Sequence, residues 1–272
     1  MLTRSIVTVI LGLFSILFIS PLLWMLSAAS KVEKDVMAFP IQWIPQQWNF
    51  AENFKTVWMG NIPFGLNYFN SLKLSITMTI LTLLFASMAG FAFAKLNFPL
   101  RNKLFILLLA FFLIPSESTL VPRFIMIKWL GLYNTHAGLI LMGSFTITLT
   151  FLMRQFMLGI HQEYLEAAKI DGAGYLRIFC QIALPIAKPV LATVGILKFL
   201  WTWNDYQNPL IFLMDRKLFT ITLGMESFKS EYASSYAVTM MAAVSAIIPL
   251  LILFVILQRQ VINGIAGGGI KG

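Results

Sequence analysis

The sequence predicts an all-α integral membrane protein with about six transmembrane helices, and three observations support this fold class. Hydrophobic residues make up 58% of the 272 residues and charged residues only 11%, whereas a soluble domain carries about 25% charged residues. The apolar segments are long and unbroken, as spanning helices require. The strands of a membrane β-barrel would instead alternate polar and apolar residues. We therefore expect a single transmembrane domain over 1–272.

Each expected span is an apolar run, because about 20 helical residues cross about 30 Å of hydrocarbon. The expected spans are 6–29, 72–94, 104–122, 136–157, 189–213 and 236–257. The first could also be a cleaved signal peptide, since Ser27-Ala28-Ala29 has the small residues of a cleavage site. Its apolar run is longer than the usual stretch of about 7–15 residues and carries Pro21 and Trp24, so we favour a span.

The loop charges predict the orientation, because Lys and Arg concentrate on the cytoplasmic side. One set of loops, which includes both termini, holds ten basic and three acidic residues, a net charge of +7. The other set holds eight basic and seven acidic residues, a net charge of +1. We expect the first set, and both termini, to be cytoplasmic. The overall net charge of +9 then follows from membrane topology, and nucleic-acid binding is not indicated.

The longest outer loop, 30–71, is rich in tryptophan and proline. Trp43, Trp48 and Trp58 would sit well at headgroup level, because the indole ring is apolar and its N–H is polar. The loop is therefore expected to lie on the membrane surface, and docking of a partner is the alternative. After the third span, Pro122, Gly131 and Asn134 are expected to break the helix and leave a short helix on the outer side.

The loop at 159–188 is charged and punctuated by glycine, unlike the spans on either side. Good helix formers precede Gly172 and Gly174, which supply the backbone freedom of a sharp turn. A second short helix is expected from Tyr175 to Leu184, ended by Pro185. Such a hairpin could rest on lipid headgroups. Its three acidic residues instead favour docking on a partner in the aqueous phase.

The same loop carries the motif EAA-x-x-DGA-x-x-x-x-x-F-x-x-I-x-LP, which resembles the coupling loop of the membrane subunits of bacterial binding-protein-dependent ABC importers. The matching residues are Glu166, Ala167, Ala168, Asp171, Gly172, Ala173, Phe179, Ile182, Leu184 and Pro185. The tail 258–272 and the segments GLYNT (131–135) and WNDY (203–206) are similar to those of MalG-like carbohydrate permeases. The resemblance covers nearly the whole chain and is weakest over 30–71.

The resemblance implies a type I ABC importer fold with a cytoplasmic EAA coupling hairpin, in the bacterial plasma (inner) membrane. It implies four partners: a second, MalF-like permease subunit, two copies of a cytoplasmic ATPase, an extracytoplasmic solute-binding protein and a sugar substrate. The coupling residues would be Glu166, Ala167, Ala168, Asp171, Gly172, Ala173 and Phe179. In the tail, the ATPase-contacting residues would be Gly268, Gly269, Lys271 and Gly272. A disordered end is the alternative for the tail.

The fifth span offers a candidate substrate path. Lys198 and Asp205 lie about two helical turns apart and should face one side, and ionisable groups inside a span usually face a cavity or a partner. Trp201, Trp203, Asn204 and Tyr206 lie nearby, and with Asp205 they combine aromatic faces and hydrogen-bonding groups, which suit sugars. Alternatively, Asn204 and Asp205 cap a broken helix or pair with the sister subunit. Lys198 could attend an acidic sugar or form a structural ion pair.

The sequence lacks the GxxxxGK[ST] motif that cradles the phosphates of ATP. We therefore expect no cofactor in this chain, with ATP and Mg bound by the partner ATPase. No catalytic triad, carboxylate pair or metal-ligand cluster is evident, so an enzyme is not indicated. The expected function is ATP-driven import of a sugar or oligosaccharide. Import of a polyol, sugar phosphate or acidic saccharide, and passive conduction, are the alternatives.

Overall fold

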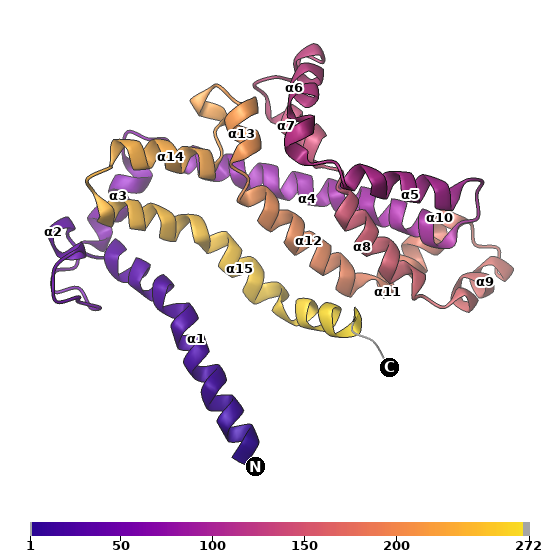
Figure 1. Ribbon diagram of the computed structural model, residues 1–272, viewed down its shortest axis with the longest axis horizontal. Helices are drawn as coiled ribbons and strands as arrows, with labels where there is room; N and C mark the ends of the chain where they lie inside the picture. The colour runs from indigo at the N-terminus through magenta and orange to yellow at the C-terminus, as the bar shows by residue number, and fades with distance from the viewer. Residues whose placement is uncertain (1, 269–272) are drawn as a thin grey trace. The chain divides into compact units, whose positions relative to one another are not determined.

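The computed structural model describes residues 2–268, with side chains described for 5–258. Over these residues the chain is built of helices joined by short loops, with one isolated β-bridge between Lys31 and Trp48 (Figure 1). Three helices are long and apolar enough to cross a membrane, and three bent helix pairs bring the number to six if each pair is one span. This confirms the predicted fold class.

The helical elements follow one another along the whole described chain. They are α1 (Leu2–Ala29), α2 (Glu33–Val36), α3 (Phe50–Met59), α4 (Phe64–Lys95), α5 (Arg101–Phe112), η1 (Ser116–Thr119), α6 (Leu120–Trp129), α7 (His136–Gly143), α8 (Ile147–Leu158), α9 (Gln162–Ile170), α10 (Tyr175–Ile178), η2 (Phe179–Ala183), α11 (Leu184–Ile186), α12 (Lys188–Trp203), α13 (Gln207–Phe212), η3 (Arg216–Leu218), α14 (Ile221–Glu231) and α15 (Tyr236–Gly268). The chain divides into two compact units, one of Met1–Tyr68 with Ile221–Pro249 and one of Phe69–Thr220 with Leu250–Gly272.

In the first unit, the segment expected as an outer loop is largely structured. It contains α2, α3 and the first turns of α4, which begins at Phe64 rather than near residue 72. Aromatic rings pack there: Trp58 lies 5.2 Å from Phe64, and Phe64 lies 6.1 Å from Phe228, between ring centroids. Such edge-on ring pairs stabilise beyond the area they bury. These contacts help to order this segment, and the expected position at the membrane surface stays a prediction.

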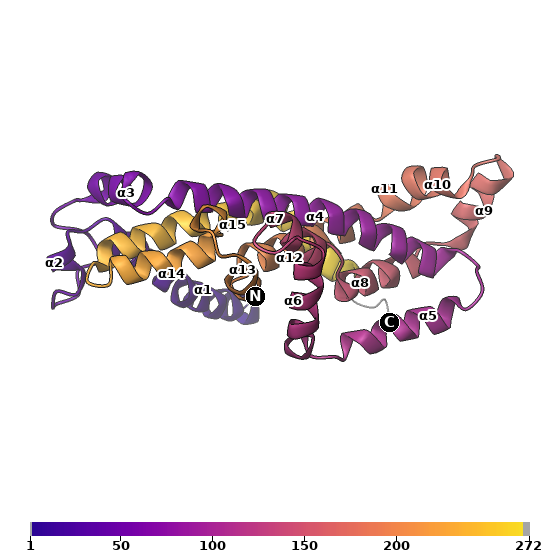
Figure 2. The same cartoon turned by 90° about the horizontal axis from the view of Figure 1, so that it is seen from above.

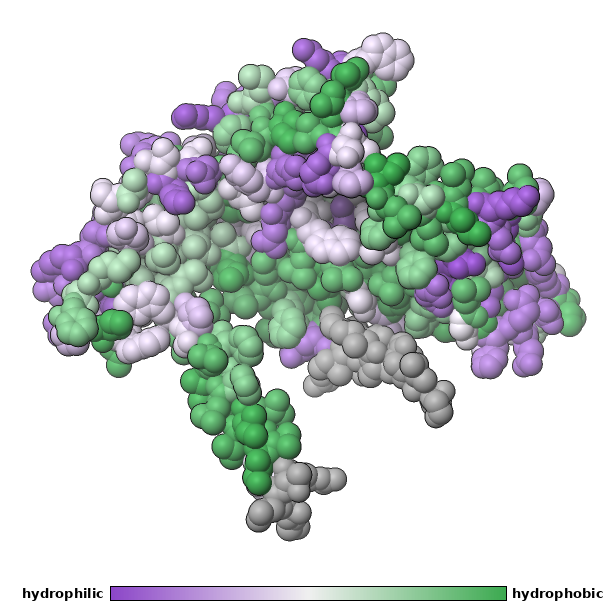
Figure 3. Space-filling model, in the orientation of Figure 1, coloured by the Kyte–Doolittle hydropathy of each residue, from purple (hydrophilic) through white to green (hydrophobic). Residues whose placement is uncertain are grey.

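Most of α1 is left uncovered by the described part of the chain, and only its last residues, such as Ala28 and Ala29, are buried. Its side chains from Ser5 to Phe18 are all exposed, and Figure 3 shows that the surface of the helix is itself hydrophobic. A helix that is apolar all round must be covered by lipid or by another protein. The composition therefore fits a membrane span, as expected for 6–29.

In the second unit, the third span bends earlier than expected. Helix α5 ends at Phe112, and the following helical segment Ser116–Trp129 turns away from it by 95°. Pro115 explains the break, because a proline lacks the N–H and forces the residue before it out of the helical region. The expectation that Pro122 breaks the helix was wrong: it lies in the first turn of α6, where its missing N–H costs nothing. The expected short helix after the break is α6.

The fourth span is also two helices, α7 and α8, bent by 41°. The break leaves backbone carbonyls without helical partners, which is costly where no water is present. Thr82 of α4 satisfies one of these carbonyls, because its hydroxyl donates a 2.8 Å hydrogen bond to the Ser144 carbonyl. The bend is thus built into the helix packing.

The fifth and sixth spans differ from the expected 189–213 and 236–257 at their ends. Helix α12 ends at Trp203, and Asn204 and Asp205 lie in the turn before α13. Asn and Asp side chains compete for backbone hydrogen bonds and favour such turns over helix interiors. Helix α15 continues to Gly268, so the backbone of the expected tail is helical as far as that residue. Gly269, Lys271 and Gly272 lie outside the described residues.

Candidate functional site

A helical hairpin formed by α9 and α10 lies at one end of the second unit (Figures 1 and 2). Its turn is a Schellman motif, in which the N–H of Gly172 donates to the Lys169 carbonyl at 2.9 Å and that of Ala173 to the Ala168 carbonyl at 2.9 Å. Gly172 has φ +78°, a left-handed conformation that favours glycine. Gly174 does not share this need, because its φ is −72°. The prediction that both glycines supply a special backbone was therefore wrong for Gly174.

The predicted coupling residues divide into exposed and buried sets. Glu166, Ala167 and Asp171 are exposed on the hairpin, and Ala168 and Ala173 are half-buried. Phe179 is buried, with its ring centroid 5.3 Å from that of Phe91 on α4. The motif thus supplies both an outward surface and an inward anchor.

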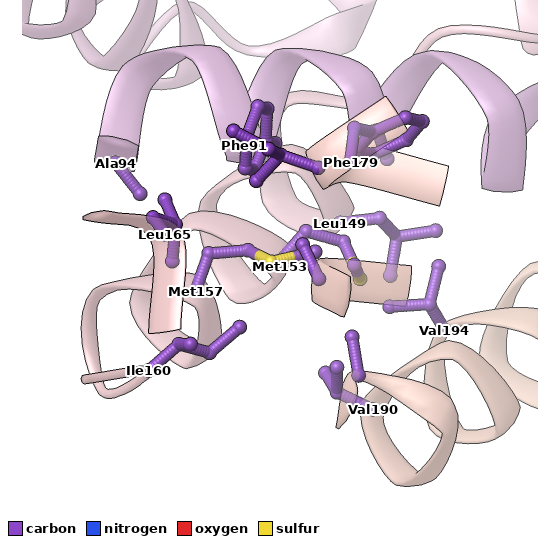
Figure 4. Packing of buried hydrophobic residues seen from close by; sticks show 14 residues of the cluster. Phe91, Ala94, Leu149, Met153, Met157, Ile160, Leu165, Phe179, Val190 and Val194 are labelled. Carbon is purple, nitrogen blue, oxygen red and sulfur yellow. The ribbon is translucent and has the colours of Figure 1, made fainter. Parts of the chain in front are cut away.

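The inward side of the hairpin joins the apolar core of the second unit (Figure 4). The core comprises Ala86, Phe91, Ala94, Leu149, Met153, Met157, Ile160, Leu165, Ile178, Phe179, Ala183, Ala187, Val190 and Val194. Leu165 and Phe179 enter it from the two arms of the hairpin. At its base, the Lys95 ammonium donates to the Ile160 carbonyl at 2.6 Å. The hairpin is therefore fastened to α4, α8 and α12.

The second arm is not the regular helix that the sequence predicts. After α10, residues Phe179–Ala183 form a π-helical turn, and α11 follows to Ile186. Pro185 lies inside α11 and does not end the second arm, contrary to expectation; the chain turns at Ala187 instead. Single π turns within helices are frequent at functional sites.

Sequence reasoning missed the exposed apolar residues at the tip of the hairpin. Ile170 is 87% exposed and Leu176 is 71% exposed, on either side of the turn. Tyr175 is also exposed, and the Lys169 ammonium lies 4.8 Å from the centre of its ring. The periodicity of the sequence could not identify these exposed residues, because it assigned the apolar positions of the second arm to one buried face. Exposed apolar groups beside charged ones are typical of a docking surface.

A cavity of about 300 Å³, lined by polar and apolar residues alike, lies in the second unit. Lys198 and Asp205 both line it, as the sequence predicts for one side of the fifth span. The other predicted substrate-path residues do not: Trp203 is buried with its ring stacked on Phe199, and Asn204 donates to the Leu200 carbonyl at 2.9 Å. Tyr206 is partly exposed and is not in the lining.

Asp205 caps the short helix that follows it. Its carboxylate accepts from the Asn208 N–H at 3.1 Å and from the Asn208 side-chain amide at 2.8 Å. This is the capping role left open by the sequence. Lys198, only 6% exposed, interacts electrostatically with the same carboxylate. The structural ion pair and a cavity-facing role are thus both compatible with Lys198.

Trp201, an aromatic residue that the sequence suggests for sugar contacts, also lines the cavity. The lining further contains residues that the sequence did not single out for the substrate path: Arg123 of α6, Thr202 and Asn208. The Arg123 guanidinium donates to the Ser116 carbonyl at 3.1 Å and approaches the Asn208 side-chain oxygen at 3.5 Å. Arg123 reaches the cavity only because the chain bends at Pro115, so no local pattern could have indicated it.

Comparison with known proteins places this architecture in a family. Residues 82–266 match the family described as "Binding-protein-dependent transport system inner membrane component". The chain is 31% identical over 271 residues to the arabinooligosaccharides transport system permease protein AraQ of Bacillus subtilis, covering 99% of this chain and 96% of that protein. It is 32% identical to the melibiose/raffinose/stachyose import permease protein MelC of the same species, covering 99% and 98%.

A solved structure agrees in fold. A chain of a bacterial ABC transporter involved in the import of the acidic polysaccharide alginate superposes with a TM-score of 0.83 at 21% sequence identity, covering 95% of this chain and 96% of that chain.

Over the residues that the structure describes, no group of three or more His, Cys, Asp or Glu side chains is placed to hold a metal ion.

Proposed function

The chain belongs to the binding-protein-dependent transport system inner membrane components, and we propose that it is a permease subunit of an ATP-driven importer for a sugar or oligosaccharide. The relatives AraQ and MelC are named for saccharide transport or import, which supports this solute class. The observation that carries the proposal is the hairpin, whose tip is exposed while its two arms are fixed in the core by Leu165 and Phe179.

This geometry suits a lever. A partner that moves the tip would move α4, α8 and α12 with it, because close-packed interiors transmit displacement rather than absorb it. Import requires two states with different contacts, and closure of two ATPase subunits around ATP and Mg would supply the difference in free energy. The chain itself would bind neither ATP nor Mg, in keeping with its lack of a P-loop.

The proposed assembly has this chain, a MalF-like second permease, two ATPase copies and an extracytoplasmic binding protein. The hairpin and both termini would face the cytoplasm of a bacterial cell. Glu166 would pair with a basic residue of the ATPase, and Ile170 and Leu176 would enter an apolar groove on it. Tail residues Gly268, Gly269, Lys271 and Gly272 would reach the ATPase interface. Lys198 and Asp205 would line the solute path.

Reconstituted uptake tests the proposal. The complete importer, purified with its partners and placed in liposomes, should accumulate labelled arabinotriose or raffinose only when ATP is hydrolysed. Leu176→Ser and Ile170→Ser should release the ATPase during purification. Val121→Ser, which removes a 62% exposed apolar side chain from α6, is the matched control and should retain it. Uptake that continues without ATP hydrolysis would instead indicate a passive channel.

A further inference from the structure

The cavity of the second unit has three charged residues in its lining. Its charged lining residues are two cations, Arg123 and Lys198, and one anion, Asp205. Glu117 also attracts Arg123, but it is exposed and lies outside the lining, so solvent weakens its effect. The lining therefore carries a formal charge of about +1. Lys198 is buried and Arg123 half-buried, and uncompensated charge is costly away from water, so an anion would be a favourable occupant of the cavity.

The hydrogen-bonding groups of the lining support the same conclusion. Arg123 and Lys198 carry N–H donors and no acceptor in their charged forms. Asp205, the one carboxylate of the lining, already accepts two hydrogen bonds from Asn208. An incoming group that carries acceptors would therefore find donors in the lining with little competition.

Lys198 is closely surrounded by its neighbours. Helix α7 ends at Gly143, and a Cβ there would lie 3.7 Å from the Nζ of Lys198, which is an ordinary contact distance. Lys198 is only 6% exposed and lines the cavity, so its side chain is available to an occupant of the cavity.

From these observations we infer that the cavity binds the carboxylate of an acidic saccharide, such as a uronic acid unit, in the importer proposed above. A carboxylate carries one negative charge and matches the lining, whereas a phosphate monoester carries about −1.5 to −2 and would face Asp205 with excess charge. Arg123 can bind a carboxylate through two N–H groups, and Lys198 supplies a second cation. Trp201 offers an aromatic face to the C–H groups of the sugar ring. A cavity of about 300 Å³ is at the small end of ligand sites, so it would hold one end of the solute.

Binding of a matched pair of probes tests the inference. The complete importer in lipid nanodiscs is titrated calorimetrically with trigalacturonate and with its fully methyl-esterified form, which has the same sugar rings but no charge. We expect the acid to bind at least tenfold more tightly than the ester. Lys198→Met should abolish this preference, and Lys198→Arg should retain most of it. Lys73→Met, which removes an exposed lysine of α4 that does not line the cavity, is the control and should change nothing.

A second variant keeps the test decisive if Lys198→Met does not fold. Asp205→Asn removes the opposing negative charge and keeps an oxygen that can accept from the Asn208 N–H, so it should strengthen binding of the acid severalfold. If Lys198 serves only as the structural partner of Asp205, the acid and the ester bind equally and Asp205→Asn lowers stability without favouring the acid. That outcome overturns the inference but leaves ATP-driven uptake of neutral saccharides intact. If the unmutated importer shows no ATP-driven uptake of any saccharide, the proposed function itself is overturned.

Discussion

The ring of Phe179 in the hairpin packs against the ring of Phe91 in α4, with their centroids 5.3 Å apart. The two residues are far apart in sequence, and each is almost fully buried. Through this contact the second arm of the hairpin is tied to α4, a helix of 32 residues. A load applied at the tip would therefore reach α4 directly.

Phe179→Ala should uncouple ATP hydrolysis from uptake while leaving the tip intact. Truncating a buried phenylalanine costs about 3–5 kcal/mol and leaves a cavity into which the arm can shift. We expect the ATPase to remain bound, with uptake per ATP hydrolysed falling severalfold. Phe111→Ala, which removes a 57% exposed ring from α5 outside the hairpin, is the control for this readout. Unchanged uptake per ATP in Phe179→Ala would show that this contact does not transmit force.

The two glycines of the hairpin turn allow a matched comparison. A Cβ at either Gly172 or Gly174 would meet nothing within 4 Å, so only backbone conformation distinguishes them. Gly172→Ala must hold φ near +78°, which costs about 1–2 kcal/mol, whereas Gly174→Ala keeps an ordinary extended φ. We expect weaker ATPase retention and lower uptake for Gly172→Ala only. Equal effects of the two changes would mean that the turn geometry is not what the partner recognises.

The single cysteine of the chain gives a direct test of orientation. Cys180 is exposed on the hairpin, so a membrane-impermeant maleimide should label it only after the cells are permeabilised. As the control, Ser234→Cys in a Cys180→Ser background places a thiol at the exposed turn before α15, which should label in intact cells. Labelling of Cys180 in intact cells would show that the topology is the opposite of the one that the loop charges predict.

Helices α4 and α8 approach so closely that a small residue is needed between them. A Cβ at Gly90 would lie 2.8 Å from the Cβ of Met153 and 2.9 Å from the backbone nitrogen of Arg154, and neither can move freely. Gly90→Ala should therefore destabilise the second unit by about 1–3 kcal/mol and lower the melting temperature in detergent. Gly195→Ala is the control, because its Cβ would meet only side-chain carbons at 3.6 Å or more. If Gly90→Ala melts at as high a temperature as Gly195→Ala, the contact between α4 and α8 is not as tight as the structure indicates.

Local signals in the sequence were sufficient for the apolar spans and for the presence of a sharp turn in the hairpin, but not for the bends within the spans. Apolar runs predict the spans because hydrocarbon admits few alternatives. Two glycines predict the turn, and the structure gives the left-handed conformation to Gly172 alone. The sequence places the break of the third span at Pro122, whereas the structure places it at Pro115. Either proline could end a helix, and the packing of the folded chain decides which one does.

The composition of the cavity could not be predicted from local signals. Arg123 and Lys198 are 75 positions apart and meet the same cavity only after the chain has folded. The same limit applies to Trp203, whose neighbours Asn204 and Asp205 suggested a polar path although its own ring is buried. Spacing gives the side of a helix on which a residue lies, but it does not say what covers that side.

Glu33 caps a helix that begins about 200 residues later in the chain. Its carboxylate accepts from the backbone N–H groups of Tyr236 and Ala237, both at 2.8 Å, and from the Ser235 hydroxyl at 3.2 Å. These N–H groups belong to the first turn of α15 and have no partner within the helix, and a carboxylate also complements the positive helix end. All four residues belong to the first unit.

Glu33→Ala should therefore destabilise the first unit by about 1–3 kcal/mol, because it leaves two helix N–H groups unpaired at a partly buried position. The measurement is the melting temperature of the purified protein in detergent. Glu52→Ala, at an exposed position in the first turn of α3, is the control and should change it by less than half as much. Glu33→Gln should fall between the two, since it keeps an acceptor oxygen but loses the charge. Equal melting temperatures for Glu33→Ala and Glu52→Ala would show that this carboxylate does not hold the start of α15.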